Sequence, residues 1–160
     1  IAMGAKKFVL FGSCGVLDDG KVKDRIIIPV AALRDEGTSY HYLASAPEIE
    51  AAPASIQAVE HVLASLGYSY IKGKTWTSDG IYREAKAAIQ ERRQEGCLAV
   101  EMECASMLAV AKYRNIPFIQ FLYGADSLSK DTWEIRDLAL HGLPQAEKYM
   151  TLALECGLAL

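Results

Sequence analysis

The sequence has no long apolar run and no excess of positive charge. No stretch approaches the length of a membrane span, and the N-terminus lacks the charged-then-apolar plan of a signal peptide. There are 17 Lys and Arg against 20 Asp and Glu, a net charge of −3, and no Lys/Arg cluster stands out. Proteins that bind a nucleic-acid backbone or a membrane surface usually carry such basic clusters. We therefore expect no nucleic acid and no membrane as partner, but a small molecule.

The cysteines lack the spacing of a metal site. The sequence has no CxxC motif and no Cys/His pair at ligand spacing, so we expect no metal. The four cysteines are Cys14, Cys97, Cys104 and Cys156. Three of them lie in apolar or helical contexts, which is typical of reduced, packed thiols and predicts a cytoplasmic protein.

The length of the chain limits the number of domains. With 160 residues, 51% of them hydrophobic, it can form one substantial core but not two. We therefore expect a single domain over residues 1–160. Residues 1–4 have the pattern of a last helical turn ending at a glycine cap, without the earlier turns. This predicts that the domain is the C-terminal fragment of a longer chain.

Short apolar runs alternate with helical patterns along the sequence. The runs predict strands at residues 8–11, 25–30, 68–76, 98–100 and 118–123. Helices are predicted at 54–66, 82–94, 104–114 and 143–160, and loops at 34–43 and 47–53. Strands interleaved with helices predict an α/β fold, a three-layer α/β/α structure around a mixed, largely parallel sheet.

Two carboxylates stand where the strand at 98–100 meets the helix at 104–114. They are Glu101 and Glu103, separated by Met102. On a helix, residues two apart point about 200° apart, so the two carboxylates need not share a role. One interpretation is electrostatic, since a glutamate in the first helical turn gains roughly 0.3–1 kcal/mol from the helix dipole. In the other, a carboxylate accepts two hydrogen bonds from a vicinal diol such as that of ribose.

Two segments that follow predicted strands have the composition of binding turns. Residues 12–15, Gly-Ser-Cys-Gly, are small enough for backbone N–H groups and the Ser13 hydroxyl to converge on an anion, although an ordinary tight turn is the alternative. Asp126 comes just after Gly124, where strand ends present side chains to a ligand crevice. A helix cap or a turn is the alternative for this aspartate.

Five motifs, in their order and spacing, resemble the nucleoside phosphorylase and nucleosidase superfamily. They are Gly-Ser-Cys-Gly at 12–15, Glu-Gly-Thr-Ser at 36–39, Thr-Ser-Asp at 77–79, Val-Glu-Met-Glu at 100–103 and Ala-Asp-Ser at 125–127. The resemblance runs from about Phe8 to the C-terminus. It implies a nucleoside phosphorylase, a pentosyltransferase that cleaves the N-glycosidic bond of a purine or uridine-type nucleoside. Inorganic phosphate would be the co-substrate, without a cofactor, and the protein would form a dimer-based homo-oligomer.

The resemblance implies roles at the sugar and at the phosphate. Superfamily members use the second glutamate of Val-Glu-Met-Glu to hold the ribose hydroxyls and the methionine to pack against the sugar. These roles fall on Glu103 and Met102, while Glu101 matches the motif with a less defined role in ribose binding. The Gly-Ser-Cys-Gly turn contacts phosphate in the phosphorylases, which indicates Ser13 and Gly15.

The resemblance also implies which residues contact the base of the nucleoside. In purine-cleaving relatives an aspartate at the position of Asp126 assists departure of the base, so we expect Asp126 to act as general acid. Arg136 would support it, unless it is a solvent-facing charge on a helix. Relatives place a stacking aromatic where this chain has Ile81, so stacking would fall to Tyr82 or Trp76.

Besides Ile81, the sequence departs from the family pattern at two places. Leu10 stands where many phosphorylases carry an arginine, and losing a charge-assisted phosphate contact is expensive. A phosphate-independent nucleosidase is therefore an alternative, as is a nucleoside-binding domain without turnover. The identity of the base is open as well. Asp126 favours a purine, whereas residues 34–42 resemble the corresponding segment of uridine phosphorylases. Arg83 and Glu84 replace the Gln and Arg pattern that is specific to uridine. We expect the 160-residue chain alone to have little or no phosphorolytic activity.

Overall fold

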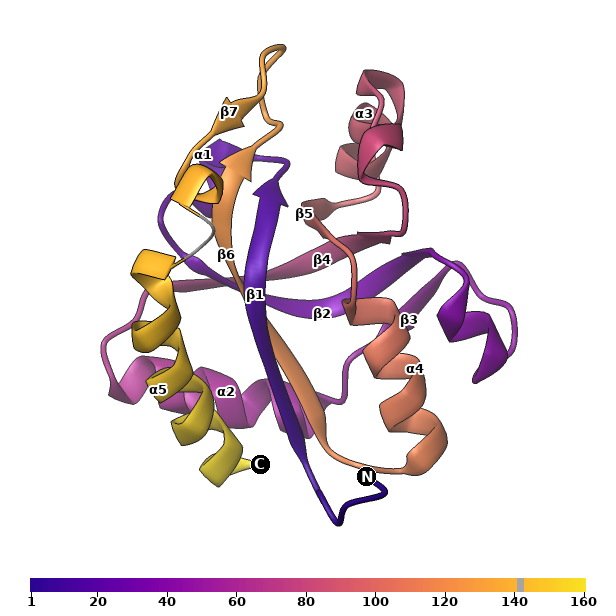
Figure 1. The fold of residues 1–160 in the computed structure, drawn as a ribbon, viewed down its shortest axis with the longest axis vertical. Helices are drawn as coiled ribbons and strands as arrows, with labels where there is room; N and C mark the ends of the chain where they lie inside the picture. Colours follow the sequence, from indigo (N-terminus) through magenta and orange to yellow (C-terminus); the bar gives the residue numbers. More distant parts are fainter. Residues whose placement is uncertain (141–142) are drawn as a thin grey trace.

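A mixed sheet forms the centre of the protein (Figure 1), and the computed structural model describes residues 1–140 and 143–160. The strands are β1 (Phe8–Val16), β2 (Ile26–Asp35), β3 (Glu48–Glu50), β4 (Tyr70–Ser78), β5 (Cys97–Glu101), β6 (Phe118–Ser127) and β7 (Glu134–Ile135). The α-helices are α1 (Asp19–Val22), α2 (Pro53–Ser65), α3 (Lys86–Gln94), α4 (Cys104–Arg114) and α5 (Leu143–Ala159). The 3-10 helices are η1 (Thr38–His41), η2 (Ile81–Arg83) and η3 (Asp137–Leu140).

The sheet has the strand order β3-β2-β4-β5-β1-β6-β7, and β6 also pairs with β2. This extra pairing, between Ile27 and Leu122, closes β2, β4, β5, β1 and β6 into a ring. The long ladders β1–β6 and β2–β4 are parallel, whereas β1–β5, β2–β3 and β6–β7 are antiparallel. The predicted single α/β domain with a mixed, largely parallel sheet is confirmed. Its sheet curls instead of lying flat, so that β1 and β2 cross in Figure 1.

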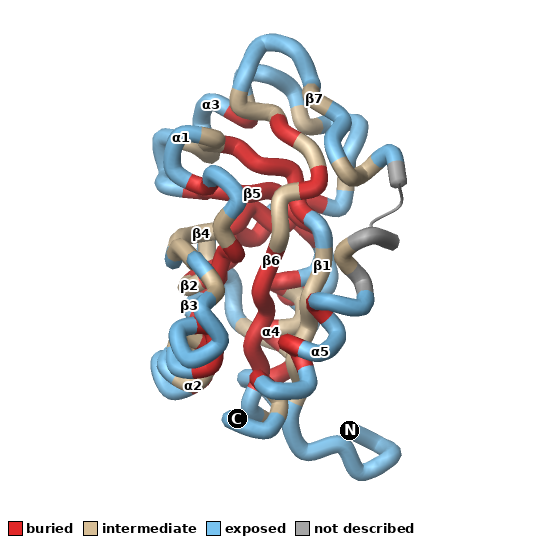
Figure 2. Tube along the Cα trace, turned by 90° about the vertical axis from the view of Figure 1, so that its left-hand side faces the viewer, coloured by how far each residue is buried: buried red, intermediate tan, exposed pale blue. Residues whose placement is uncertain are grey.

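Helices cover the sheet on both sides. Side chains from α2, α4 and α5 share one core cluster with β2 and β6, including Val59, Leu108, Phe121 and Leu152. Helix α3 contributes Ile89 to a separate cluster with residues of β2, β4 and β5. A third cluster, inside the ring, is built mainly by strands. In Figure 2, buried residues follow β6, and exposed residues lie on the outer sides of α2 and α5.

Strands β1 and β6 are longer than the sequence pattern predicted. The prediction of a turn at residues 12–15 was wrong, because β1 continues through them and pairs with β6 as far as Val16. Likewise β6 does not end at Gly124 but continues to Ser127. Each strand supplies the backbone partner that extends the other, a contact that periodicity within one segment does not reveal. The predicted helix at 82–94 begins only at Lys86.

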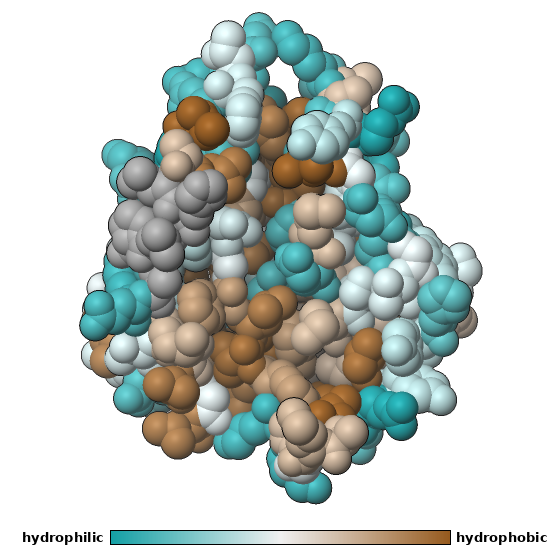
Figure 3. Space-filling view, viewed as in Figure 1, coloured by the Kyte–Doolittle hydropathy of each residue, from teal (hydrophilic) through white to brown (hydrophobic). Residues whose placement is uncertain are grey.

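Apolar side chains also reach the surface. On the face shown in Figure 3 they gather in the lower half, where β1 lies between α5 and α4 in Figure 1. Residues 8–11 of β1 are only partly buried there, and Met150, Leu154 and Leu158 of α5 are exposed. In the described part of the chain, no helix combines the length and the apolar character needed to cross a membrane.

Candidate active site

One pocket of about 390 Å³ collects all the predicted site residues except Trp76 and Arg136. Its lining residues come from β1, β5 and β6, from η2 and from the segment between β6 and β7, with further residues beside these elements. The residues that line it are Ser13, Cys14, Gly15, Ile81, Tyr82, Glu84, Val100, Glu101, Met102, Glu103, Asp126, Leu128, Trp133 and Leu138. The pocket therefore joins segments that are far apart in the sequence.

The parallel pairing of β1 and β6 brings Ser13, Gly15 and Asp126 together. Both strands end at the same edge of the sheet, the usual place for a ligand crevice in α/β folds. A bulge between Cys14 and Gly15 shifts the register, so that Gly15 lies opposite Asp126. A Cβ added to Gly15 would lie 2.9 Å from Val100 Cγ1 and 3.6 Å from Asp126 Oδ1. The absence of a side chain at Gly15 therefore avoids close contacts with Val100 and Asp126, which line the same pocket.

Glu101 is a structural residue whose carboxylate is fully engaged. It is 5% exposed, and Oε2 accepts hydrogen bonds from the backbone N–H groups of Glu103 (2.9 Å) and Cys104 (2.7 Å). Oε1 accepts a hydrogen bond from the Thr77 hydroxyl at 2.6 Å. Burial raises the pKa of Glu101, while these hydrogen bonds oppose the rise. The side chain thus caps the start of α4 and fixes the backbone of Glu103.

Glu103 and Met102 are exposed at the same pocket. Met102 is 42% exposed, which is unusual for a residue between a buried strand and a helix. Within the part of the chain that the structure describes, no hydrogen bond or ion pair reaches the Glu103 carboxylate. Both of its oxygens can therefore accept hydrogen bonds from a ligand, while Met102 offers an apolar contact beside them.

Trp133 and Glu84 are among the pocket residues that were not predicted from the sequence. Trp133 donates a hydrogen bond from Nε1 to Asp126 Oδ2 at 2.7 Å, and no sequence motif marks it. Glu84 lines the pocket after η2, and burial together with the Asp126 carboxylate raises its pKa to about 7. The sequence offered one signal for Glu84, since Arg83 and Glu84 stand in place of the Gln and Arg pattern specific to uridine.

The comparisons with known proteins agree with this geometry. A family model described as the phosphorylase superfamily matches residues 1–154. The chain belongs to the phosphorylase superfamily.

The curated relatives that the chain matches are named for different nucleosides. The chain is 31% identical to a uridine phosphorylase of Thermococcus kodakarensis, over 69% of this chain and 44% of that protein. It is 32% identical to a DeoD-type purine nucleoside phosphorylase of Colwellia psychrerythraea, over 68% of this chain and 47% of that protein. The chain thus spans about half the length of these curated relatives.

Solved structures show the same fold. An AMP nucleosidase from Bacteroides thetaiotaomicron matches 94% of this chain and 59% of its own, with a TM-score of 0.74 and 21% identity. A purine nucleoside phosphorylase from Toxoplasma gondii, solved in complex with immucillin-H, matches 79% of this chain and 52% of its own, with a TM-score of 0.69 and 24% identity. At these identities the likeness concerns the superfamily fold and not the substrate.

Trp76, predicted as a residue that stacks on the base, lies elsewhere. It is 2% exposed and packs in the cluster under α3, outside the pocket. Its Nε1 donates a hydrogen bond to Asp35 Oδ2 at 3.0 Å, so both its ring and its polar group are used inside the fold. This corrects the expectation, because alternation along β4 points Trp76 into the core. Ile81 and Tyr82 do line the pocket, where they are 53% and 98% exposed.

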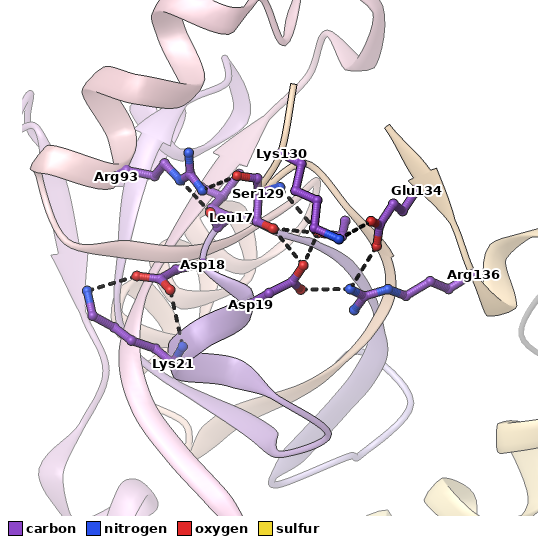
Figure 4. Close-up of polar contacts among 10 residues, drawn as sticks. Leu17, Asp18, Asp19, Lys21, Arg93, Ser129, Lys130, Glu134 and Arg136 are labelled. Atoms are coloured by element: carbon purple, nitrogen blue, oxygen red, sulfur yellow. Dashed lines mark hydrogen bonds and ion pairs between the residues drawn. The ribbon is translucent and has the colours of Figure 1, made fainter. Parts of the chain in front are cut away.

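Arg136, predicted to support Asp126, faces another part of the surface. Its Nη2 contacts Asp19 Oδ1 at 2.8 Å and Glu134 Oε2 at 3.4 Å, as Figure 4 shows. The Ser129 hydroxyl donates to Asp19 Oδ2 at 2.6 Å. Burial acts to raise the pKa of Asp19, but the hydrogen bonds lower it overall. Arg136, directly after β7, therefore links α1 to β7 through Asp19 and Glu134, and it does not line the pocket with Asp126.

The charged side chains among the described residues that line the pocket are all acidic. Four carboxyl groups line it, those of Glu84, Glu101, Glu103 and Asp126, and no Lys, Arg or His is among the described residues that do so. Within the described part of the chain no group of His, Cys, Asp and Glu is arranged to hold a metal ion. Such a pocket favours an uncharged ligand with hydrogen-bond donors over an anion.

Proposed function

We propose that this domain forms the nucleoside-binding part of a nucleoside phosphorylase, which breaks the N-glycosidic bond of its substrate with inorganic phosphate. The observation that carries the proposal is the single pocket shared by Glu103, Met102 and Asp126, with Ser13 and Gly15 beside them. These residues come from β1, β6 and the junction of β5 with α4. In that pocket a ribose and its base can be held at once.

The sugar is the part of the substrate for which the site is best formed. The free carboxylate of Glu103 suits a vicinal diol, because each oxygen can accept one hydroxyl donor. Met102 offers the apolar contact to the sugar ring. As the glycosidic bond breaks, the sugar gains positive charge, and a fixed carboxylate nearby stabilises that charge more than it stabilises the ground state.

The base would lie toward Asp126, Tyr82 and Ile81. Asp126 is held by Trp133 and is placed to hydrogen-bond or protonate a base as it departs. The exposed ring of Tyr82 is available to stack on the base. Ser13 and the backbone at Gly15 would be on the side of the attacking nucleophile, and Arg136 has no part in this scheme.

A phosphate-independent nucleosidase is the second candidate. It is favoured by the absence of a cationic side chain among the described residues that line the pocket, because water needs no such partner whereas phosphate does. A nucleoside-binding domain without turnover would use the same sugar contacts. The dimer-based oligomer stays a prediction.

Because the 160 residues alone are expected to have little phosphorolytic activity, the test is an assay of the purified full-length protein with a panel of purine and pyrimidine nucleosides, with and without phosphate. We expect ribose 1-phosphate to appear only when phosphate is present. Free ribose formed at the same rate without phosphate would support the nucleosidase, and binding without any product would support the binding domain.

A matched pair of variants ties the activity to the pocket. Glu103→Ala should lower kcat/KM by about 100-fold, since it removes two charge-assisted hydrogen bonds to the sugar. Glu147→Ala, an exposed glutamate of α5 that does not line the pocket, is the control and should change nothing. Equal activity of both variants would contradict the role of Glu103.

A further inference from the structure

Glu84 lies in the pocket with no partner of its own. The described part of the chain offers no hydrogen bond or ion pair to its carboxyl group, although the residue is half-buried. The backbone before it is held firmly, since Arg83 N–H donates to Gly80 O at 2.7 Å and Gly80 N–H donates to Ser78 Oγ at 3.1 Å. The position of Glu84 is therefore set by the turn η2, and its carboxyl group is left for a ligand.

Asp126 and Glu84 differ in their hydrogen-bond partners. The indole N–H of Trp133 donates a hydrogen bond to Asp126 Oδ2 at 2.7 Å. Glu84 has no such donor, and burial and the charge of Asp126 raise its pKa to about 7. Of the two carboxyl groups, Glu84 has the poorer partners, so Glu84 is the one that keeps its proton most readily.

The other charged groups near Glu84 do not reverse this assignment. Glu101 and Glu103 also line the pocket and are acidic. Arg83 and Lys86 precede and follow Glu84 in the chain, but neither lines the pocket, and Lys86 Nζ lies 3.4 Å from Asp131 Oδ1. No described cation inside the pocket therefore favours the ionised form of Glu84.

We propose that Glu84 is the proton donor to the leaving base, and that Asp126 is the neighbour that hydrogen-bonds the base. The proposal rests on the proposed function of the pocket and goes beyond it by naming the acid and the class of base. An acid is most effective when it still holds its proton at neutral pH and gives it up as charge develops on the base.

The step balances as follows. The bond between C1′ of the sugar and the base nitrogen breaks, and its electron pair goes to the base. The Glu84 O–H bond breaks, and its proton goes to a basic ring nitrogen of the base. An oxygen of phosphate bonds to C1′, the proton of the hydrogen phosphate passes to solvent, and Glu84 takes a proton back from solvent. The products are ribose 1-phosphate and the neutral base.

This scheme selects a class of base. Purines have a basic nitrogen in the imidazole ring, away from the glycosidic bond, which can take the proton. Uracil has no basic ring nitrogen of this kind. We therefore expect purine nucleosides to be cleaved faster than uridine.

The decisive measurement is the pH dependence of kcat/KM for inosine in wild type, Glu84→Gln and Asp126→Asn. Wild-type activity should fall as pH rises through about 7, because Glu84 loses its proton there. Glu84→Gln should lower kcat/KM at pH 6 by about 100-fold and abolish this descending limb. Glu91→Gln, an exposed glutamate of α3 outside the pocket, is the matched control and should keep the wild-type profile. Glu84→Asp, which keeps an acid, should recover part of the activity.

A second substrate separates proton donation from damage to the pocket. The base of 7-methylguanosine already carries positive charge at pH 6 and needs no proton to leave. Glu84→Gln should cleave it within about 3-fold of wild type. An equal loss on inosine and on 7-methylguanosine would show that Glu84 shapes the pocket and would overturn the proposal.

The remaining outcomes distinguish this proposal from the function on which it rests. If wild type cleaves inosine, Glu84→Gln keeps the wild-type profile and Asp126→Asn loses the descending limb, then Asp126 is the acid and only the proposal on Glu84 fails. If wild type cleaves no nucleoside, the proposed function fails and the proposal fails with it. A 13C NMR titration of the Glu84 carboxyl adds a readout without turnover. A midpoint near 7 that falls in Asp126→Asn supports Glu84 as the acid, and a midpoint near 4.5 contradicts it.

Discussion

Replacing Glu101 by alanine should destabilise the fold, whereas replacing Glu103 by alanine should leave stability unchanged and remove nucleoside binding. The two glutamates are neighbours in the same motif, yet their environments differ. Glu101 is buried and accepts hydrogen bonds from the α4 backbone and from Thr77, while Glu103 is exposed at the pocket. The pair of variants therefore separates a structural carboxylate from a ligand-binding one.

The magnitude follows from the donors that Glu101 satisfies. Its loss leaves the N–H groups of Glu103 and Cys104 and the hydroxyl of Thr77 without this acceptor. A buried donor left unsatisfied costs about 1–3 kcal/mol, and removing a buried carboxylate returns part of that cost as relieved desolvation. We expect Glu101→Ala to lower the free energy of unfolding by about 3–5 kcal/mol in total. For a chain of this size that is a fall in Tm of about 10 °C.

The assay is urea unfolding and thermal melting of both variants beside wild type, with nucleoside binding measured below the transition. Glu101→Gln should be intermediate in stability, because its amide oxygen can accept from one set of donors but its NH2 group cannot. Glu103→Ala should melt with wild type, within about 0.5 kcal/mol, since substitutions of exposed residues are usually that small. The reasoning is refuted if Glu101→Ala melts with wild type, or if Glu103→Ala is the less stable variant.

Three further substitutions test where the structure places Trp76, Gly15 and Glu84. Trp76→Phe should cost about 1–2 kcal/mol, through the lost bond to Asp35 and looser packing, without changing the KM for nucleoside; a changed KM would contradict its place in the core. Gly15→Ala should cost about 1–3 kcal/mol, because the new Cβ meets Val100 Cγ1 at 2.9 Å, and should also raise KM; unchanged melting would show that this contact relaxes freely. Because the folded pKa of Glu84 is raised from 4.5 to about 7, its contribution to stability is fully present below pH 4.5 and lost as pH rises through 7. Glu84→Gln should therefore be more stable than wild type at pH 8 by about 1–2 kcal/mol, with solvent screening allowed for, and denaturation curves at pH 4.5 should show no such gain.

The elements set by local pattern were predicted well. The helix predicted at 104–114 is α4, Cys104–Arg114, and it ends where Asn115 adopts φ 51°, a left-handed conformation that asparagine tolerates. The helix predicted at 54–66 is α2, Pro53–Ser65. In both, the spacing of apolar residues and a breaker at the end lie within one segment, so the sequence holds all the information needed.

Features that depend on contacts with a distant segment of the same chain were predicted less well. The small residues 12–15 have the composition of a turn, but they form a strand because β6 runs parallel to them and supplies hydrogen bonds. Trp76 was expected at the base because the motif around it resembles a base pocket, yet the pleat of β4 points it into the core. Arg136 is held by Asp19, a residue far away in the sequence, and no local pattern announces that contact.

By itself, the sequence determined the superfamily and the α/β class, because these depend on motifs and periodicity within short segments. Only the tertiary structure decided which of the neighbouring glutamates has a carboxylate held by hydrogen bonds, since that depends on which donors surround each one. It also decided that Glu84 shares a pocket with Asp126 and Trp133. The curled sheet brings those three residues to one pocket, and the raised pKa of Glu84 depends on its burial there beside Asp126, not on either segment alone.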